Sequence, residues 1–187
     1  DGAGRPVPQV GGREDRRDLA HLSMQHVPEQ QRAQGDPERT AMFAAMLAVP
    51  TEGYLGELMA EIDVDGLQRA RRALRASLAV ELFERWLELY GVNASDGPYQ
   101  PDSRSVARRA LRNLALGFLC AAGDSRSADV RHLLLAQYRG ADNLTDRLAS
   151  LREIINAEWL DEPARVDTID DFYTRWSAQK LVIDQWF

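Results

Sequence analysis

From Asp36 onward, apolar residues recur every three or four positions, and no segment of useful length alternates apolar with polar residues. The first pattern gathers apolar side chains on one face of a helix, whereas a half-buried strand requires the second. Glycine, proline and other turn-forming residues separate the helical segments at short intervals. The sequence therefore predicts an all-α fold whose consecutive helices are antiparallel neighbours, as in a bundle or a solenoid of stacked helix pairs.

Helix starts are expected where a capping residue precedes a periodic apolar segment. Asp36 before Pro37 predicts one start, and Thr51 predicts the restart of a short helix after Pro50. Later helices are expected from Asp102 or Ser103 to Gly123, from Ser125 or Ser127 to Gly140, after Asp142 and Asn143, and after Pro163. The run Leu181–Ile183 is also compatible with a strand.

The longest expected helix runs from Gly66 to Tyr90, with Asp65 as its cap and Gly91 as its stop. Its apolar residues follow one another in steps of three and four. The predicted stripe consists of Leu67, Ala70, Leu74, Leu78, Leu82 and Trp86.

Residues 1–37 differ from the rest of the chain, because Gly, Pro, Gln and Arg dominate and no apolar period is sustained. Such a segment cannot bury enough apolar surface to offset the entropy lost on ordering. We expect a flexible or poorly packed lead-in with one short helix near Leu19–Gln25, followed by one helical domain over residues 38–187. Since the first residue is Asp1 rather than Met, we expect a processed product, a trimmed segment or a piece of a longer polypeptide.

The composition is that of a soluble globular domain: 187 residues, a formal net charge of −6, 44% hydrophobic and 28% charged residues. No apolar run approaches the ~20 residues of a membrane span, and no apolar signal segment is visible near the N-terminus. A single cysteine excludes an internal disulfide and fits a reducing compartment, so we expect a cytoplasmic protein. The acidic balance disfavours a general nucleic-acid binder.

The histidines do not have the spacing of a zinc site. They are His21, His26 and His132, and the first two are five residues apart rather than four. Leu22 stands where a metalloprotease requires Glu beside the first histidine. A solvated pair is the better interpretation of the first two histidines.

A calcium site is the second metal hypothesis. Glu61, Asp63, Asp65 and Gly66 match four positions of an EF-hand loop, but Arg72 stands where a bidentate carboxylate is required. Acidic residues at a helix start explain the two aspartates without a metal. No metal-binding residue is therefore predicted.

Arginines cluster on two of the expected helices, and the stretch ARRALR at residues 70–75 recurs 37 residues later at 107–112. This spacing lies near the length of two-helix repeats. The clusters could contact nucleic-acid phosphates, but pairing with acidic residues of neighbouring helices is favoured because the net charge is negative. The clustered arginines are Arg69, Arg71, Arg72 and Arg75 on the first helix and Arg104, Arg108, Arg109 and Arg112 on the second.

No catalytic or cofactor-binding residue is predicted. Cys120 stands among apolar residues, as a buried inert thiol does. The sequence contains no nucleophile elbow, phosphate-binding loop or dinucleotide-binding fingerprint. Asn93 and Asn143 match glycosylation sequons, but we interpret them as turn and helix-cap residues.

Several segments in the right order and spacing resemble the C-terminal helical domain of bacterial aminopeptidase N, over about residues 42–187. Two lie upstream, VPTEGYL at 49–55 and IDVDGL at 62–67. Four lie in the second half: RRALRNLALGFL at 108–119, ADNLTDRLASL at 141–151, DFYTRW at 171–176 and LVIDQWF at 181–187.

The resemblance implies an α-solenoid that packs against the catalytic domain of the same polypeptide and narrows access to its zinc cleft. It implies a parent that is a zinc-dependent exopeptidase and removes N-terminal residues from its peptide substrate. The family's zinc-binding and amine-binding motifs are absent here, so this chain is expected to hold no catalytic, metal or cofactor residue and to be inactive alone. Leu144 and Gln185 stand where the family commonly has Met and Lys.

Family members continue past the Trp-Phe pair with more helices, so the resemblance predicts an incomplete solenoid. Its apolar end, including Val182, Ile183, Trp186 and Phe187, would be exposed and would support self-association. Two other functions stay open from the sequence: a free-standing helical-repeat module that binds a protein partner, and an arginine-rich DNA-binding regulator. Contact with a membrane is not expected.

Overall fold

The structure, a computed structural model, describes residues 36–184, which belong to one compact unit. The expected lead-in lies outside the described residues apart from its last two, and so does the short helix expected near Leu19–Gln25. The boundary at residue 38 stays a prediction.

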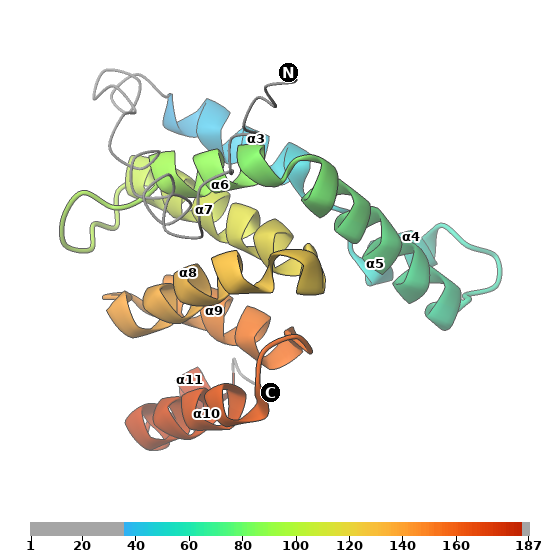
Figure 1. Ribbon diagram of the computed structural model, residues 1–187. Helices are drawn as coiled ribbons and strands as arrows, with labels where there is room; N and C mark the ends of the chain where they lie inside the picture. The colour runs from blue at the N-terminus through green and yellow to red at the C-terminus, as the bar shows by residue number, and fades with distance from the viewer. Residues whose placement is uncertain (1–35, 185–187) are drawn as a thin grey trace, which may run out of the picture. The chain divides into compact units, whose positions relative to one another are not determined.

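The described residues form helices joined by turns, with no strand among them, which confirms the all-α prediction. The helices are α3 (Pro37–Leu47), α4 (Glu52–Glu57), α5 (Val64–Glu81), α6 (Phe83–Val92), α7 (Ser103–Ala121), the 3-10 helix η1 (Gly123–Arg126), α8 (Ser127–Gly140), α9 (Leu144–Asn156), α10 (Glu162–Trp176) and α11 (Lys180–Ile183). The chain folds back at successive connections, so that α6 to α10 lie against one another in a stack (Figure 1).

Four expected capping residues occupy the start of a helix. They are Asp36, Thr51, Asp102 and Asn143, at the starts of α3, α4, α7 and α9. Each side-chain oxygen accepts a hydrogen bond from a backbone N–H two or three residues later, at 2.9 to 3.2 Å. These starts are confirmed.

The prediction of one helix from Gly66 to Tyr90 is wrong at its start and in its middle. The cap is Asp63 rather than Asp65: the Asp63 carboxylate accepts a hydrogen bond from the backbone N–H of Gly66 at 2.8 Å. The helix then breaks at Leu82, which has φ −111° and ψ 20°.

The break changes which apolar side chains face the core. Leu82, predicted as part of the stripe, is exposed, whereas the next residue, Phe83, is buried. Across the break, the indole N–H of Trp86 donates to the carbonyl oxygen of Leu78 at 3.0 Å. The stripe prediction also fails at Leu74, which is exposed.

Two further expectations are corrected. The helix α8 begins at Ser127 with Arg126 in the capping position, and no side chain makes a capping hydrogen bond there, so the expected serine cap is wrong. The run Leu181–Ile183 belongs to the short helix α11 rather than to a strand. The predicted stop at Gly123 is confirmed, because its φ of +67° is a conformation that glycine adopts without strain.

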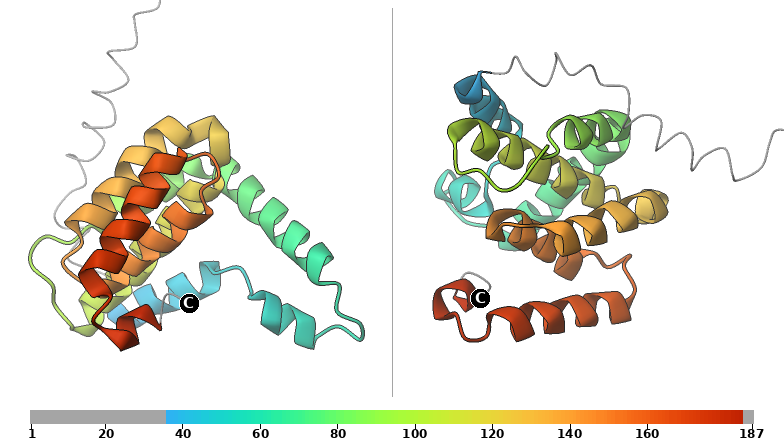
Figure 2. Two further views of the ribbon diagram at one scale, coloured as in Figure 1. Left: turned by 90° about the horizontal axis from the view of Figure 1, so that it is seen from below. Right: turned by 90° about the vertical axis from the view of Figure 1, so that its left-hand side faces the viewer.

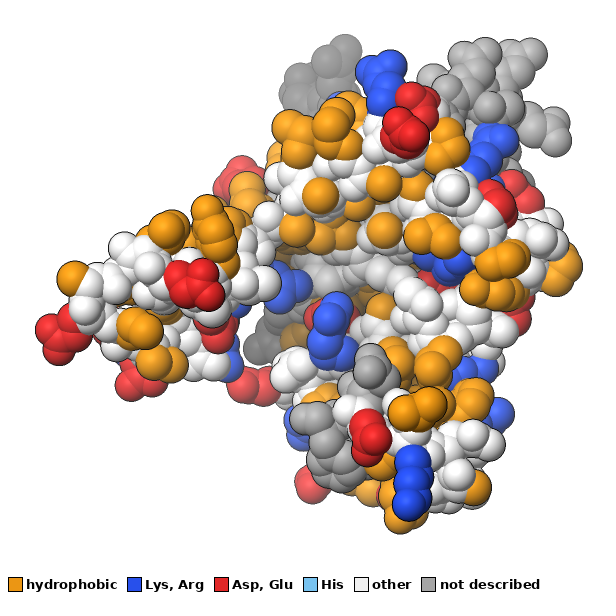
Figure 3. Space-filling model, turned by 180° about the vertical axis from the view of Figure 1, so that it is seen from behind, with side chains coloured by type: hydrophobic (Ala, Val, Ile, Leu, Met, Phe, Trp, Pro, Cys, Tyr) orange, Lys and Arg blue, Asp and Glu red, His pale blue; other side chains and the backbone are white. Residues whose placement is uncertain are grey.

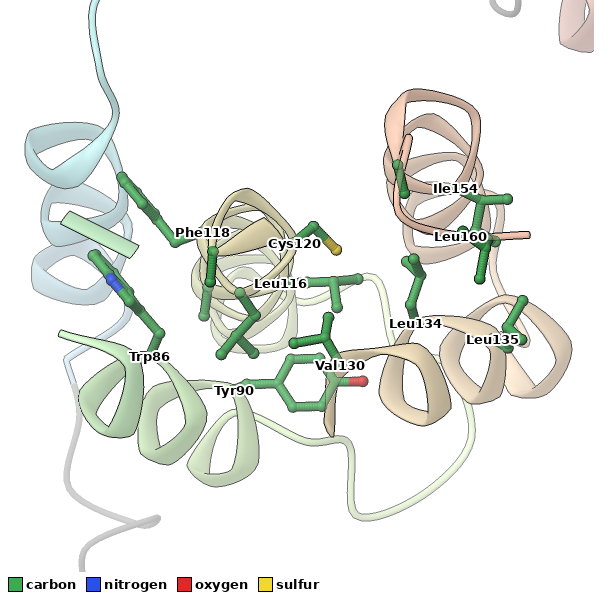
Figure 4. Close-up of a cluster of buried hydrophobic side chains, with 14 of the residues drawn as sticks. Trp86, Tyr90, Leu116, Phe118, Cys120, Val130, Leu134, Leu135, Ile154 and Leu160 are labelled. Carbon is green, nitrogen blue, oxygen red and sulfur yellow. The ribbon is translucent and has the colours of Figure 1, made fainter. Parts of the chain in front are cut away.

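The core lies between the helices of the stack. Trp86 on α6 and Phe118 on α7 stack with ring centroids 4.1 Å apart and planes 2° apart, at one side of the cluster drawn in Figure 4. Ile154 and Leu160 lie at the other side. The largest fully buried side chains are Phe118, Phe172, Leu116, Leu119, Leu134, Leu151, Ile154, Val130 and Ser150.

A buried polar network ties three helices of the stack together. The Asp146 carboxylate on α9 accepts hydrogen bonds from the side-chain amides of Asn113 on α7 at 2.8 Å and of Asn143 at 2.9 Å. The Gln137 amide on α8 donates to the Asn113 side-chain oxygen at 2.8 Å and to the Asp146 carbonyl at 3.2 Å. These hydrogen bonds link α7, α8 and α9 and help to fix how the three helices pack, while the Gln137 side-chain oxygen is buried without a hydrogen-bond partner.

A second polar contact joins α8 to α10. The Tyr138 hydroxyl lies 2.9 Å from a carboxylate oxygen of Asp171, which also pairs with Arg175 at 2.8 Å. Burial, together with the neighbouring carboxylate, raises the pKa of Tyr138. Partial burial opposes ionisation of Asp171, but hydrogen bonds from Arg175 and Tyr138 outweigh it and hold the pKa of that carboxyl below its usual range.

One region extends away from the stack, and we call it the arm: residues 51–74, which comprise α4, the connection after it and the first turns of α5 (Figure 2). Gly56 is the only buried residue among these positions, all of which are described. Arg71 ties α5 to the start of α4, because it donates to the Pro50 carbonyl at 2.7 Å and pairs with Glu52 at 2.6 Å.

Candidate interaction surface

The described residues offer no candidate metal centre. His132 is exposed on α8, and His21 and His26 lie outside the described part of the chain. Within residues 36–184, no group of three or more His, Cys, Asp or Glu side chains is placed to hold a metal ion. Asp63 and Gly66, which match positions of a calcium-binding loop but are not predicted to bind a metal, form the capping contact of α5.

The lone cysteine is not placed as a nucleophile. Cys120 is buried in the core on α7, and burial together with the nearby Glu153 carboxylate raises the pKa of its thiol. A thiol held in its protonated form reacts slowly, since the thiolate is the nucleophile. This agrees with the inert role that the sequence suggested.

The arginine clusters serve mainly as ties between helices. In the repeated ARRALR stretch, Arg71 and Arg108 occupy the same position and make the same kind of contact. Arg71 reaches the Pro50 carbonyl and Glu52, and Arg108 reaches the Ala94 carbonyl and Asp96, in each case a carbonyl and a carboxylate two residues apart. The internal repeat therefore has a structural counterpart, in which an arginine ties its helix to a preceding connection: the one before α4 for Arg71, and the one before α7 for Arg108.

Other arginines of the clusters also contact protein groups. Arg75 donates to the Gly117 carbonyl at 3.1 Å, and Arg112 donates to the Tyr90 hydroxyl at 3.0 Å. Arg109 donates to the Gln100 carbonyl at 2.9 Å. The remaining members, Arg69, Arg72 and Arg104, are exposed.

The most distinctive surface of the described residues is the apolar surface of the arm. Its large apolar side chains are left open to solvent, with acidic side chains between them (Figure 3). The exposed fractions are 56% for Tyr54, 68% for Leu58, 38% for Met59, 57% for Ile62 and 66% for Val64. The sequence places Tyr54, Leu58 and Met59 at helical spacing in the short helix expected after Pro50, but it does not show that no helix of the described chain covers them.

A shallow apolar hollow lies on the arm between α4 and the start of α5. Its volume is about 290 Å³. The residues that line it are Glu52, Gly53, Gly56, Glu57, Ile62, Val64 and Leu67. An apolar hollow next to exposed apolar side chains is suited to receive a side chain of a partner protein.

A second hollow, of about 480 Å³, lies where the first turns of α8 and α10 meet. It is polar: Arg131 pairs with Asp161 across it, and Glu158, Glu162 and Arg165 also line it. The hydrogen bond from Arg131 lowers the pKa of Asp161. Because charges of both signs line the hollow and two of them pair, it does not select an anion or a cation.

Two other apolar regions were expected from the sequence. The outer face of α3 exposes Met42, Phe43, Met46 and Leu47. The expected exposed end is corrected in part, because Val182 and Ile183 are half-buried against the core, while Trp186 and Phe187 lie outside the described residues.

The chain matches a family described as "Domain of unknown function (DUF3458_C) ARM repeats" over residues 17–187. It is also similar to three proteins named Aminopeptidase N: it is 34% identical over 147 residues to that of Escherichia coli K12, 30% over 154 residues to that of Caulobacter vibrioides, and 32% over 143 residues to that of Haemophilus influenzae. The predicted resemblance and the α-solenoid class are confirmed.

These similarities cover most of this chain but little of the relatives. The aligned segments span 79%, 81% and 76% of this chain, and 16%, 17% and 15% of the three aminopeptidases. The chain therefore spans about a sixth of the length of the curated relatives it matches. Over the described residues, no helix is both long enough and apolar enough to cross a bilayer.

Proposed function

Because this chain belongs to the ARM-repeat family described as DUF3458_C, we propose that it is a non-catalytic helical domain of an aminopeptidase N. The parent removes N-terminal residues from peptides in the cytoplasm. This domain packs on the catalytic domain of the same polypeptide and restricts access to its cleft. The similarity to three aminopeptidases over about four-fifths of this chain carries the proposal.

In this proposal, the catalytic zinc of the parent is bound outside the described residues. A catalytic zinc takes three protein ligands and keeps one position open for water or substrate. Residues 36–184 do not fit that requirement, since they bring together no three ligating side chains. In this proposal, residues 36–184 contribute shape and contact surface to the parent.

The stack is suited to stand beside a cleft. Its helices are held by a buried aromatic pair and by buried hydrogen bonds between α7, α8 and α9. Such cores deform little, because close-packed interiors have low compressibility. A rigid stack can exclude large substrates from a neighbouring cleft without moving.

The test begins with the reading frame on both sides of the segment. We expect it to encode a longer polypeptide that hydrolyses an aminoacyl p-nitroanilide, loses that activity to a chelator and regains it with zinc. The 187-residue chain alone should be inactive. Chelator-resistant turnover by the pure 187-residue chain would contradict the proposal, and a frame that starts before Asp1 and stops after Phe187 would favour the free-standing binding module instead.

A further inference from the structure

We propose that the arm is the surface through which this domain docks on the remainder of its own polypeptide. The inference rests on the proposed function and adds the contact that holds the domain in place. The docking surface combines exposed apolar side chains with carboxylates that lie between them, so the opposing surface is apolar and carries arginine or lysine.

The apolar centre consists of side chains that a free-standing monomer has no reason to expose. Five large apolar residues lie within eleven positions, and four of them are more than half exposed. Contiguous exposed patches of this kind mark interaction sites. These residues are Tyr54, Leu58, Met59, Ile62 and Val64.

The hollow of about 290 Å³ gives this patch a place for an anchoring side chain. Gly56 forms part of its floor, and a Cβ at that position would lie 3.6 Å from the Ile62 side chain. The absence of a side chain there keeps the hollow open. Interfaces gain most of their affinity from a few side chains that enter such pockets.

The charge around the patch identifies the character of the partner surface. Residues 51–68 contain five carboxylates and no lysine or arginine. Among the arginines that follow this segment, Arg71 already pairs with Glu52 and donates a hydrogen bond to the Pro50 carbonyl. A surface that carries these carboxylates favours a basic partner surface and repels a second acidic one.

The same charge argues for an occupant in cis rather than a second copy. Two copies meeting through the arm would bring ten carboxylates together, which the arginines at positions 69, 71 and 72 offset only in part, and like charges in a contact destabilise it. The relatives carry about five-sixths of their length outside the matched segment. A linked segment of that size meets the arm at high effective concentration, so a modest surface suffices.

The experiment compares amide hydrogen exchange of residues 51–68 in the 187-residue chain and in the longer polypeptide encoded by the same reading frame. We expect exchange at least tenfold slower in the longer polypeptide. The double variant Leu58→Ser with Val64→Ser should remove this protection. Serine at position 64 suits the first helical turn, so α5 is retained. The matched control is Val80→Ser with Val106→Ser, which changes two valines about half exposed outside the arm and should retain it.

Two outcomes overturn the docking surface. The first is equal exchange in the two polypeptides, and the second is protection that persists in the double variant. In either case, chelator-sensitive hydrolysis by the longer polypeptide would leave the proposed function standing. Protection that appears in the 187-residue chain on raising its concentration would assign the arm to a second copy. Conversely, arm protection in a longer polypeptide that hydrolyses no aminoacyl substrate would support the docking surface and remove the proposed function.

Discussion

The stack and the arm carry similar apolar residues, but the stack buries them and the arm exposes them to solvent. In the stack, Trp86 lies against Phe118, and most of the large apolar side chains of α7 are buried. In the arm, apolar residues at the same helical spacing are exposed, and Gly56 is the one buried position. The comparison shows that a helical apolar face indicates a contact but does not indicate whether the contact partner lies within the same domain.

Polar groups differ in the same way. The stack buries Asp146 with amide partners on two other helices, whereas the carboxylates of the arm stay at the surface. Buried polar groups that satisfy one another fix a single packing, while exposed charges select a partner. Buried contacts hold the stack together, and recognition of the arm by a partner is what we propose.

The largest expected effect comes from removing a buried aromatic ring from the core of the stack. Phe118→Ala should lower the free energy of unfolding by about 3–5 kcal/mol, because a fully buried aromatic ring leaves a cavity against Trp86. Leu58→Ala, at a 68% exposed position of the arm, should change it by less than about 0.5 kcal/mol. Urea unfolding measures both, and a comparable loss for the arm variant would break the comparison.

The next effect comes from the buried network. Asp146→Ala should cost about 1–3 kcal/mol, because it removes the carboxylate that accepts hydrogen bonds from the side-chain amides of Asn113 and Asn143. Asp146→Asn keeps one acceptor oxygen and should cost less. Thermal unfolding measures the change, with the exposed Asp170→Ala on α10 as the control. Equal stability of the Asp146 and Asp170 variants would show that the network does not hold the stack.

A smaller, local effect is expected in the arm. In Gly66→Ala, the added Cβ would lie 2.1 Å from an Asp63 carboxylate oxygen, so the α5 cap is lost at about 1 kcal/mol. Hydrogen exchange should accelerate in residues 64–70 and stay unchanged in residues 111–119. Gly53→Ala is the control, because no atom lies within 4 Å of its added Cβ. Acceleration in the stack as well would show that the two regions unfold together.

The smallest expected effect is on the stability of the fold at acidic pH, through the contact between Asp171 and Arg175. The folded-state pKa of Asp171 is depressed, so its contact with Arg175 stabilises the fold above the unfolded pKa near 4 and loses this contribution as pH falls through the folded pKa. In Asp171→Asn this acid-sensitive contribution is absent, so the free energy of unfolding should fall less steeply below pH 4 than in the unsubstituted chain. The difference should be less than about 1 kcal/mol, because the pair is partly exposed. The exposed Asp167→Asn serves as the control in acid unfolding curves. An unchanged curve for Asp171→Asn would show that this contact adds nothing.

For the arm, the apolar helical face could be predicted from the sequence, but its exposure to solvent could not. The spacing of Tyr54, Leu58 and Met59 indicated an apolar helical face, but nothing in that spacing places the face outside the core. The signal that could have been used is the five carboxylates interleaved with these residues and the absence of any lysine or arginine from 51 to 68. A core-facing segment rarely carries so many unpaired charges of one sign.

The sequence by itself determined where most helices begin. The caps at Asp36, Thr51, Asp102 and Asn143 were predictable because each capping hydrogen bond closes within three residues. Only the tertiary structure decided that the helix breaks at Leu82. A break of this kind depends on partners far along the chain, such as the stack of Trp86 on Phe118.

The same reason separates the faces that are buried from those that are not. Periodicity places apolar side chains on one side of a helix, and this is local information. Whether that side is covered depends on which distant helix packs against it, and for the arm no helix among residues 36–184 does. The sequence therefore determined the helices and their apolar faces, and the tertiary structure decided which faces form the core and which remain for a partner.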